Sequence, residues 1–413
     1  MTFNGTRHWL RFAAANTLRN RRRSLATVLV TALGTAALLL AGGFALFTYQ
    51  SLEQLSARTT GHLVLATPAQ FDGSEDVPLQ HGLDDADALR QRLLADPAVR
   101  QVLPRVAFSG LVSNGDKSTV MMAVGIDPDA EFAVKGPFLT VSAGRVLSTG
   151  RPQEVMLGEG LARSLKAAPG TGLTLLASTT EGALNALDVT VAGTFSTGVP
   201  DVDQRLVYTD VATAQKLLVT KRVTSLGVFL DRMASTLPAQ QRVQAWAGQI
   251  GTQALRVQTW LDEAFFYRSV QALYNRIFGA LGLVISVIVV FVVANAMAMA
   301  VIERTREIGT LRALGTQRSH LVGSLALEGL LLGSAGALLG ALLALAVTGL
   351  LLVLPLQMPP PPGRSVGYPL QIAFDPLLYA AVLAAMVLLA ATAAALVARR
   401  TVALPVPQAL AHV

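Results

Sequence analysis

The residues whose types and spacing most clearly suggest chemistry lie between Glu303 and Gly315, a short charged segment flanked by two long apolar runs. Acids and arginines lie three apart in it, a spacing that brings side chains together on a helix and predicts the ion pairs Glu303–Arg306 and Arg304–Glu307. The chemistry expected is therefore ionic and apolar docking by a surface helix, either on lipid headgroups or on another protein.

The same segment also carries an apolar stripe and a termination signal. Ile308, Leu311 and Leu314 recur at intervals of three and predict a narrow apolar face. Gly315 suits the position just after a helix end. The sequence thus predicts an amphipathic helix of about three turns that needs a surface to dock against.

Catalytic chemistry is not expected. Gly110 to Ser118 approaches a phosphate-binding loop, but Asp116 separates the second glycine from Lys117 and would repel phosphate oxygens, so we expect a hairpin turn there. The chain has no cysteine and five scattered histidines, which argues against disulfides, thiolate chemistry and a metal site. We expect a chain that is not an enzyme and binds no cofactor of its own.

The elements that position this segment are membrane spans. Of 413 residues, 52% are hydrophobic and only 14% are charged, a composition too apolar for an ordinary soluble domain. Apolar runs long enough to cross a bilayer predict four transmembrane helices, at residues 24–48, 271–302, 321–354 and 376–398. The predicted fold class is a membrane protein with four transmembrane α-helices and a large extracytoplasmic α+β domain, residues 49–270, inserted between helices 1 and 2.

The remaining segments follow from this division. Residues 1–23 are predicted to form an amphipathic, arginine-rich cytoplasmic helix, with a signal-peptide region as the alternative. The segment 303–320 would be the internal turn, 355–375 an extended external loop containing a proline run, and 399–413 a cytoplasmic tail. Asp375 and Pro376 are typical of the first residues of a helix.

The distribution of charge sets the orientation. Twelve arginines with only two acids lie on three short segments at the ends of apolar runs, whereas residues 49–271 hold 22 acids against 19 bases. This is the positive-inside pattern of a membrane protein, and it makes nucleic-acid binding unlikely to explain the net charge of +7. We expect both termini in the cytoplasm and the large domain outside.

Two features of the third span stand out. It holds two pairs of glycines, each pair four residues apart, which predict close helix packing, with the general abundance of glycine in spans as the alternative: Gly329 with Gly333, and Gly336 with Gly340. Glu328 is the one acid within an apolar run, so its side chain must either face other helices or reach the membrane surface.

The segment Glu303–Gly315 resembles the signature of the FtsX-like and MacB-type ABC transporter permeases, and the lipoprotein-releasing permeases are the most similar in plan. The resemblance covers almost every position of the segment, and it extends more weakly to Gly193–Gly198 in the large domain. It implies an FtsX-like permease domain at 271–413 and a MacB-like periplasmic core domain of two subdomains. It also implies that the segment is a coupling helix seated on a separate ATPase, formed by Glu303, Arg304, Arg306, Glu307, Ile308, Gly309, Leu311, Arg312, Leu314 and Gly315.

The resemblance further implies partners and cargo. ATP would be bound by an ABC ATPase dimer, and the permease would pair with a second copy or a paralogue in the bacterial inner membrane. The expected work is mechanical release or export of a lipoprotein or another amphipathic cargo, handed to a periplasmic carrier. Cargo lipid would contact Phe44, Phe47 and Ile277. The alternatives are a macrolide or peptide exporter and a transmembrane regulator of a cell-wall hydrolase.

Overall fold

The computed structural model describes residues 21–72, 77–135, 140–247, 253–354, 356–358 and 367–402. The chain divides into two compact units. A helical unit comprises the chain up to Tyr49 together with Val270–Gln357 and Pro369 onward, and a globular unit comprises Gln50–Ser269 with Met358–Tyr368. The predicted amphipathic helix before residue 21, the tail after residue 402 and the proline run of the external loop lie outside the described residues.

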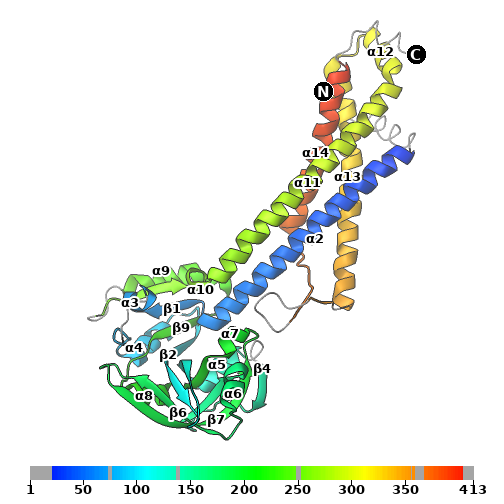
Figure 1. The fold of residues 1–413 in the computed structure, drawn as a ribbon. Helices are drawn as coiled ribbons and strands as arrows, with labels where there is room; N and C mark the ends of the chain where they lie inside the picture. The colour runs from blue at the N-terminus through cyan, green and yellow to red at the C-terminus, as the bar shows by residue number, and fades with distance from the viewer. Residues whose placement is uncertain are drawn as a thin grey trace. The chain divides into compact units, whose positions relative to one another are not determined.

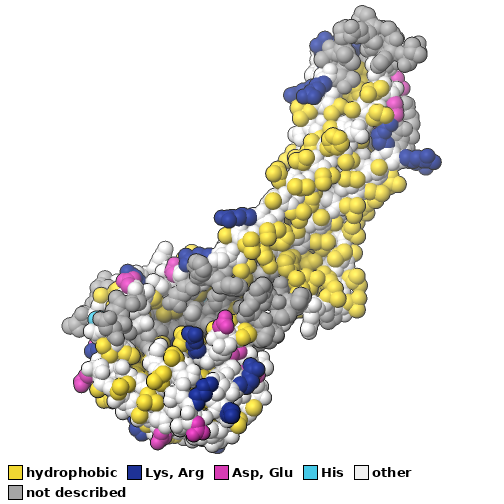
Figure 2. Space-filling model, viewed as in Figure 1, with side chains coloured by type: hydrophobic (Ala, Val, Ile, Leu, Met, Phe, Trp, Pro, Cys, Tyr) yellow, Lys and Arg dark blue, Asp and Glu magenta, His cyan; other side chains and the backbone are white. Residues whose placement is uncertain are grey.

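The helical unit is built from four helices that are long and apolar enough to cross a membrane, in agreement with the four predicted spans. Apolar side chains cover the visible face of these helices (Figure 2). The helices, which Figure 1 labels, are α2 (Arg21–Thr60), α11 (Phe265–Glu303), α13 (Arg318–Val353) and α14 (Pro376–Val402).

All four helices extend beyond the predicted spans at one end or both. α2 continues past residue 48 because no glycine or proline lies between that residue and Gly61, whose φ of +106° ends the helix. α14 begins as predicted, since the Asp375 carboxylate accepts a hydrogen bond from the backbone N–H of Leu377 at 2.8 Å. The apolar core of the unit is formed by α11, α13 and α14, with Val293, Leu325 and Ala390 among its buried residues.

The strands of the globular unit form a closed ring of six with an open sheet attached. The ring runs β2–β3–β8–β5–β7–β6 and returns to β2, and β4 pairs with the last residues of β7, beyond those that pair with β6. These strands are β2 (Val99–Ser113), β3 (Ser118–Ile126), β4 (Thr140–Gly144), β5 (Glu154–Gly158), β6 (Gly172–Ser178), β7 (Leu184–Ser196) and β8 (Leu206–Asp210).

The open sheet has the order β10–β1–β9–β2, so β2 belongs to both parts. Residues 99–105 of β2 pair with β9, and residues 106–113 pair with β3. The additional strands are β1 (Leu63–Ala66), β9 (Ser225–Leu230) and β10 (Arg256–Thr259). Residues of both strand groups contribute to one cluster of buried apolar side chains.

Short helices cover the strands. α8 packs against β2, β3, β6, β7 and β8 of the ring, and α4 and α9 contribute buried side chains to the core beside the open sheet. The helices are α3 (Pro68–Asp72), α4 (Ala86–Leu94), α5 (Pro128–Lys135), α6 (Glu159–Leu165), α7 (Pro200–Asp203), α8 (Val211–Leu218), α9 (Thr236–Ala247) and α10 (Trp260–Glu263). A 3-10 turn, η2 (Met233–Ser235), precedes α9, and the loop before α14 holds β11 (Gln357–Met358) and β12 (Tyr368–Pro369).

The end of α2 is held firmly within the globular unit. The guanidinium of Arg105, on β2, donates to the Thr60 carbonyl at 3.1 Å and to the carboxylate of Glu131 on α5 at 2.9 Å. The Glu131 side chain is only 1% exposed, so this ion pair is buried. β1 follows α2 directly and pairs with β10, which leads into α10 and α11.

Candidate coupling site

The predicted coupling segment folds as a separate short helix, α12 (Thr305–Ala313), between α11 and α13. Arg304 interrupts the helical path, with φ −113° and ψ 14°. At the other end the N–H of Gly315 bonds the Arg312 carbonyl and the N–H of Thr316 bonds the Leu311 carbonyl, both at 3.0 Å. This is the Schellman pattern, and Gly315 adopts the positive φ, +92°, that the sequence predicts after the helix.

Buried polar side chains anchor the start of α12. The guanidinium of Arg304 lies 3.4 Å from the carboxylate of Glu328 on α13, and both side chains are less than 10% exposed. The hydroxyl of Thr305 donates to the carbonyls of Val301 and Ile302 at the end of α11. At this junction between α11 and α12, the Arg304 guanidinium and the Thr305 hydroxyl therefore both have partners inside the protein, as buried polar groups require.

A second ion pair joins the junction to α2. Arg23 pairs with Glu303 at the last residue of α11. A cavity of about 20 Å³ next to it is lined by Arg23, Thr27, Arg304 and Glu328. The predicted Glu303–Arg306 pair lies outside what the structure describes. The structure therefore assigns Glu303 and Arg304 partners on other helices, which the local spacing could not reveal.

The apolar stripe divides between two environments. Ile308 and Leu311 pack against the apolar core of the helical unit, so part of the surface against which α12 was expected to dock belongs to its own chain. Gly309 is buried as well. Leu314 differs from the expected stripe, because its side chain is 79% exposed.

The outer face of α12 is open in this chain. Glu307, Thr310, Ala313 and Leu314 are exposed, and Arg312 is partly exposed. An apolar leucine next to acidic, basic and hydroxyl groups can bind a complementary protein surface by burying the leucine and pairing the charges around it. Among the described residues, no group of three or more histidines, cysteines or acids could hold a metal ion there or elsewhere.

The four glycines of α13 lie at close helix contacts. A Cβ added at Gly329 or Gly333 would lie 2.3 or 2.5 Å from an alanine Cβ of α14. One added at Gly336 would lie 2.6 Å from Thr31 of α2, and at Gly340 it would lie 2.4 Å from the Ala32 carbonyl oxygen. The first pair thus faces α14 and the second pair faces α2, which places α13 between two neighbours at backbone distance.

The predicted cargo residues lie in two settings. Phe44 packs on Tyr274 and edge-on to Phe278 of α11, with ring centroids 6.1 and 6.4 Å apart, so it joins α2 to α11 within the chain. Phe47 is partly buried. Ile277 is 50% exposed. It belongs to an exposed apolar stripe of α11 that follows helical spacing: Leu273, Ile277, Leu281, Val284, Ile288 and Phe291.

Sequence reasoning missed the partners of the junction. The charge pattern treats Arg23 as one of twelve arginines at the ends of apolar runs, and it identifies no partner for Glu328. The available signal was the single acid within an apolar run, because a carboxylate in a membrane helix almost always pairs with another group. Choosing Arg304 among the arginines at that membrane face requires the three-dimensional structure.

Four long apolar helices, one compact globular insertion and a short helix held at the turn between two spans define a membrane protein of the permease class. Residues 24–246 match the family model described as the MacB-like periplasmic core domain, which covers more than half of the chain, and residues 279–406 match the FtsX-like permease C-terminal model. The chain therefore belongs to the family of MacB-type, FtsX-like permeases.

Relatives agree with this assignment. The chain is 27% identical over 264 residues to the lipoprotein-releasing system transmembrane protein LolE of Haemophilus influenzae, which is 62% of each chain. It is 26% identical over 302 residues to the macrolide export ATP-binding/permease protein MacB of Sodalis glossinidius, covering 67% of this chain and 44% of that one. The chain thus spans less than two thirds of the length of these relatives.

A solved structure is also similar to part of this chain. The periplasmic region of MacB from Actinobacillus actinomycetemcomitans is 15% identical, with a TM-score of 0.36, and the match covers 50% of this chain and 92% of that one.

Proposed function

We propose that this chain is the permease subunit of an ABC transporter, and that a separate ATPase drives it by gripping the outer face of α12. ATP hydrolysis in that partner would be converted into movement of the helices and then of the globular unit. The chain itself would bind no nucleotide. The observation that carries this proposal is the two-sided environment of α12, which is fixed on its inner face and open on its outer face.

A coupling element must transmit movement instead of absorbing it, and the anchoring of α12 meets this requirement. The Arg304–Glu328 ion pair ties the start of the helix to α13, and Ile308 and Leu311 fasten its inner face to the core of the helical unit. A push on the exposed face would therefore move the ends of α11 and α13 with it. α11 continues as one helix from Glu303 back to Phe265, next to the globular unit, and provides the route.

The test compares two exposed leucines at opposite ends of α13. Leu314 is 79% exposed beside α12, and Leu352 is 70% exposed at the far end of α13. We expect Leu314→Ser to lower co-purification with the ATPase by about tenfold or more, as loss of a central interface contact does, while Leu352→Ser leaves it unchanged. Glu307→Arg should act in the same direction. Equal co-purification of the wild type and both α12 variants would refute the assignment of α12.

We infer that the chain lies in the bacterial inner membrane with both termini and α12 in the cytoplasm, on the basis of the arginines at 21–23 and 399–400. Cysteine labelling tests this cleanly because the chain has no native cysteine. A cysteine at the exposed Ser118 should react with an impermeant reagent in intact spheroplasts. Reaction only after the membrane is opened would reverse the orientation.

We infer that the cargo is a lipoprotein or another amphipathic molecule that reaches the protein from the bilayer. The exposed stripe of α11 supports this, because it offers an acyl chain a continuous apolar surface at about 0.8 kcal/mol per buried CH₂. The name of the Haemophilus relative, a lipoprotein-releasing protein, agrees with the inference. A second permease copy or a paralogue would complete the site, and a soluble carrier would receive the cargo.

Mass spectrometry of the complex trapped without ATP hydrolysis tests the cargo separately from the coupling. An acylated protein is the expected co-purifying species. A soluble peptide or a macrolide in its place would contradict the inference, and a tightly bound cell-wall hydrolase with no acylated species would favour a regulatory function.

A further inference from the structure

The strand ring of the globular unit has a gap between β3 and β8. β3 pairs with β2 along its length from Ser118, but its pairing with β8 begins only at Met122, opposite Leu206. Among the described strands, residues 118–121 of β3 therefore have a neighbour on the β2 side and none on the other. The chain before β8 turns away into α7 instead of continuing along β3.

The backbone of this free edge points into the gap. The N–H of Met122 donates to the Arg205 carbonyl on the β8 side at 2.8 Å. Because residues two apart in a strand direct their backbone groups to the same side, the N–H and C=O of Val120 and Ser118 also point away from β2. An unpaired strand edge of this kind is a template for another extended chain.

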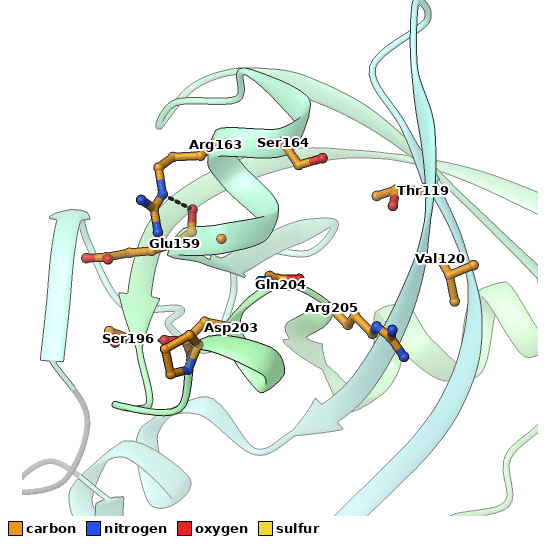
Figure 3. A pocket seen from close by; sticks show the side chains of 11 residues that line it. Thr119, Val120, Glu159, Arg163, Ser164, Ser196, Asp203, Gln204 and Arg205 are labelled. Atoms are coloured by element: carbon orange, nitrogen blue, oxygen red, sulfur yellow. Dashed lines mark hydrogen bonds between the residues drawn. The ribbon is translucent and has the colours of Figure 1, made fainter. Parts of the chain in front are cut away.

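An open cavity of about 880 Å³ occupies the gap. Thr119 and Val120 form one wall, and α6 forms the facing wall with Glu159, Arg163 and Ser164 (Figure 3). Arg205 extends from the end of α7 into the space between them (Figure 3). The volume falls within the range of pockets that bind small ligands or a few residues of a peptide.

The cavity is bounded along the strand direction. At the hairpin end, the side chain of Asn114 donates to the Leu165 carbonyl at 2.8 Å, and the Lys117 ammonium donates to the Ser164 hydroxyl at 2.9 Å. At the other end, the Met122–Arg205 backbone bond closes the gap. The space therefore suits a short extended segment and not a long strand.

Two acids and two arginines line the cavity, and the arginines are the groups with hydrogen-bond donors left for a carboxylate. The acids are already engaged: Asp203 accepts hydrogen bonds from Ser196 and Thr197, and Glu159 accepts one from Ser142. The bases are more available. Among the described residues, Arg163 donates only to the Glu159 carbonyl of its own helix, and no side chain pairs with the Arg205 guanidinium.

Exposed apolar side chains complete the surface. Val120 and Met122 are each 56% exposed on the outer face of β3, and Leu111, the cross-strand partner of Val120, is 43% exposed. A chain added at the edge would place alternate side chains beside this patch and could direct its carboxylates to the arginines across the cavity.

We propose that the edge of β3 at Ser118–Met121 is a binding site for a short, extended, acidic peptide segment of a partner protein, which adds as a strand to this free edge of β3, in line with β8. Main-chain hydrogen bonds from Val120 would hold the segment, and Arg163 and Arg205 would select its carboxylates. The site lies in the globular unit and would bind its ligand whether or not α12 engages an ATPase.

The test uses the full-length chain in nanodiscs and a fluorescent five-residue peptide of alternating valine and aspartate. We expect saturable binding by fluorescence polarisation that weakens as salt is added. Asparagine or lysine in place of aspartate should reduce affinity at least tenfold. The same acidic peptide with alternate amide nitrogens methylated should also lose binding, because it keeps its charge but cannot donate main-chain hydrogen bonds.

Two protein variants make the test specific. Val120→Pro removes the N–H that faces the cavity, and residue 120 does not hydrogen-bond to β2, so this proline should abolish binding while Val120→Thr retains it. Arg205→Ala should weaken the binding of the acidic peptide only. Leu184→Ser, at an 81% exposed residue of β7, should not change binding. No saturable binding of the acidic peptide, equal binding of the methylated peptide, or equal binding of the lysine peptide would overturn the proposal.

Discussion

Removing one partner of the Arg304–Glu328 ion pair should destabilise the helical unit and release α12. The perturbations are Arg304→Met, Glu328→Leu and the two together. Either single substitution leaves a charge buried without its partner, whereas the double variant replaces the pair with apolar side chains of similar size. Loss of one member of a buried pair typically costs about 3–5 kcal/mol, and replacement of both is often nearly neutral.

The structure gives a scale for this effect. At 3.4 Å the attraction between unit charges is about 5 kcal/mol for an effective dielectric constant of about 20. Desolvation offsets part of this attraction, and Arg23 on α2 lies close enough to line the same small cavity and moderate an unpaired Glu328. We therefore expect about 3 kcal/mol for each single variant, which corresponds to roughly 6–12 °C in the apparent melting temperature.

The measurement is size-exclusion chromatography of the detergent-solubilised protein after heating, together with co-purification of the ATPase. Both single variants should lose thermal stability and ATPase association, and the double variant should regain most of the thermal stability. Additive losses in the double variant, or single variants that melt within 1 or 2 °C of the wild type, would refute the interpretation of this pair as the anchor of α12.

Two further predictions concern packing and pH. Gly340→Ala should force α13 away from α2 and lower the stability of the folded protein by about 1–3 kcal/mol, because its Cβ would lie 2.4 Å from a backbone oxygen. Gly349→Ala, whose Cβ would have nothing within 4 Å, should leave stability unchanged. Equal thermal stability of the two variants would contradict this contact. In the globular unit, the Arg242 guanidinium, through two hydrogen bonds to Asp96, lowers the pKa of that carboxyl below its usual value of 3.8. The stability from this pair is therefore present above about pH 4 and lost as the pH falls through the lowered pKa. Asp96→Asn should lower the free energy of unfolding by about 1–2 kcal/mol at pH 7, allowing for the half-exposed arginine. In urea unfolding below pH 4, the variant and the wild type should differ less. A difference in unfolding free energy that persists there would exclude an ionic origin.

Much of the fold followed from local sequence signals. Within the globular unit, local sequence patterns predict strands at Ser225–Leu230 and Glu154–Gly158, and β9 and β5 have these bounds. Asp210, a residue type typical of helix starts, caps α8 through a 2.8 Å bond from the N–H of Thr213. The Gly110–Ser118 stretch contains the β2–β3 turn and no phosphate loop, as the position of Asp116 indicated. These features depend on residues close in sequence, which is why a local pattern reveals them.

Other features depend on distant parts of the chain and had no local signal. Sequence patterns predicted β2 only at residues 102–108, whereas the strand runs from Val99 to Ser113 because β9, β3 and β6 all pair with it. β4 was missed: it is only five residues long, it ends in a glycine, and all of its residues are exposed, so no buried face marks it as a strand. The closure of the strand ring and the partners of Glu303 and Arg304 are likewise set by contacts between segments far apart in sequence.

The pairing of β1 with β10 determines how the globular unit responds to force. The two strands are antiparallel over four residue pairs, and Leu63 lies opposite Thr259, so α2 and the α10–α11 segment are attached at the same end of one ladder. A force that separates the two attached ends across the strands would open the ladder one pair at a time from that end. A force directed along the strands, in opposite senses on β1 and β10, would load all four pairs together, and they would resist as a group. The ladder is therefore stiff toward lengthwise shear and weak toward separation of its attached ends.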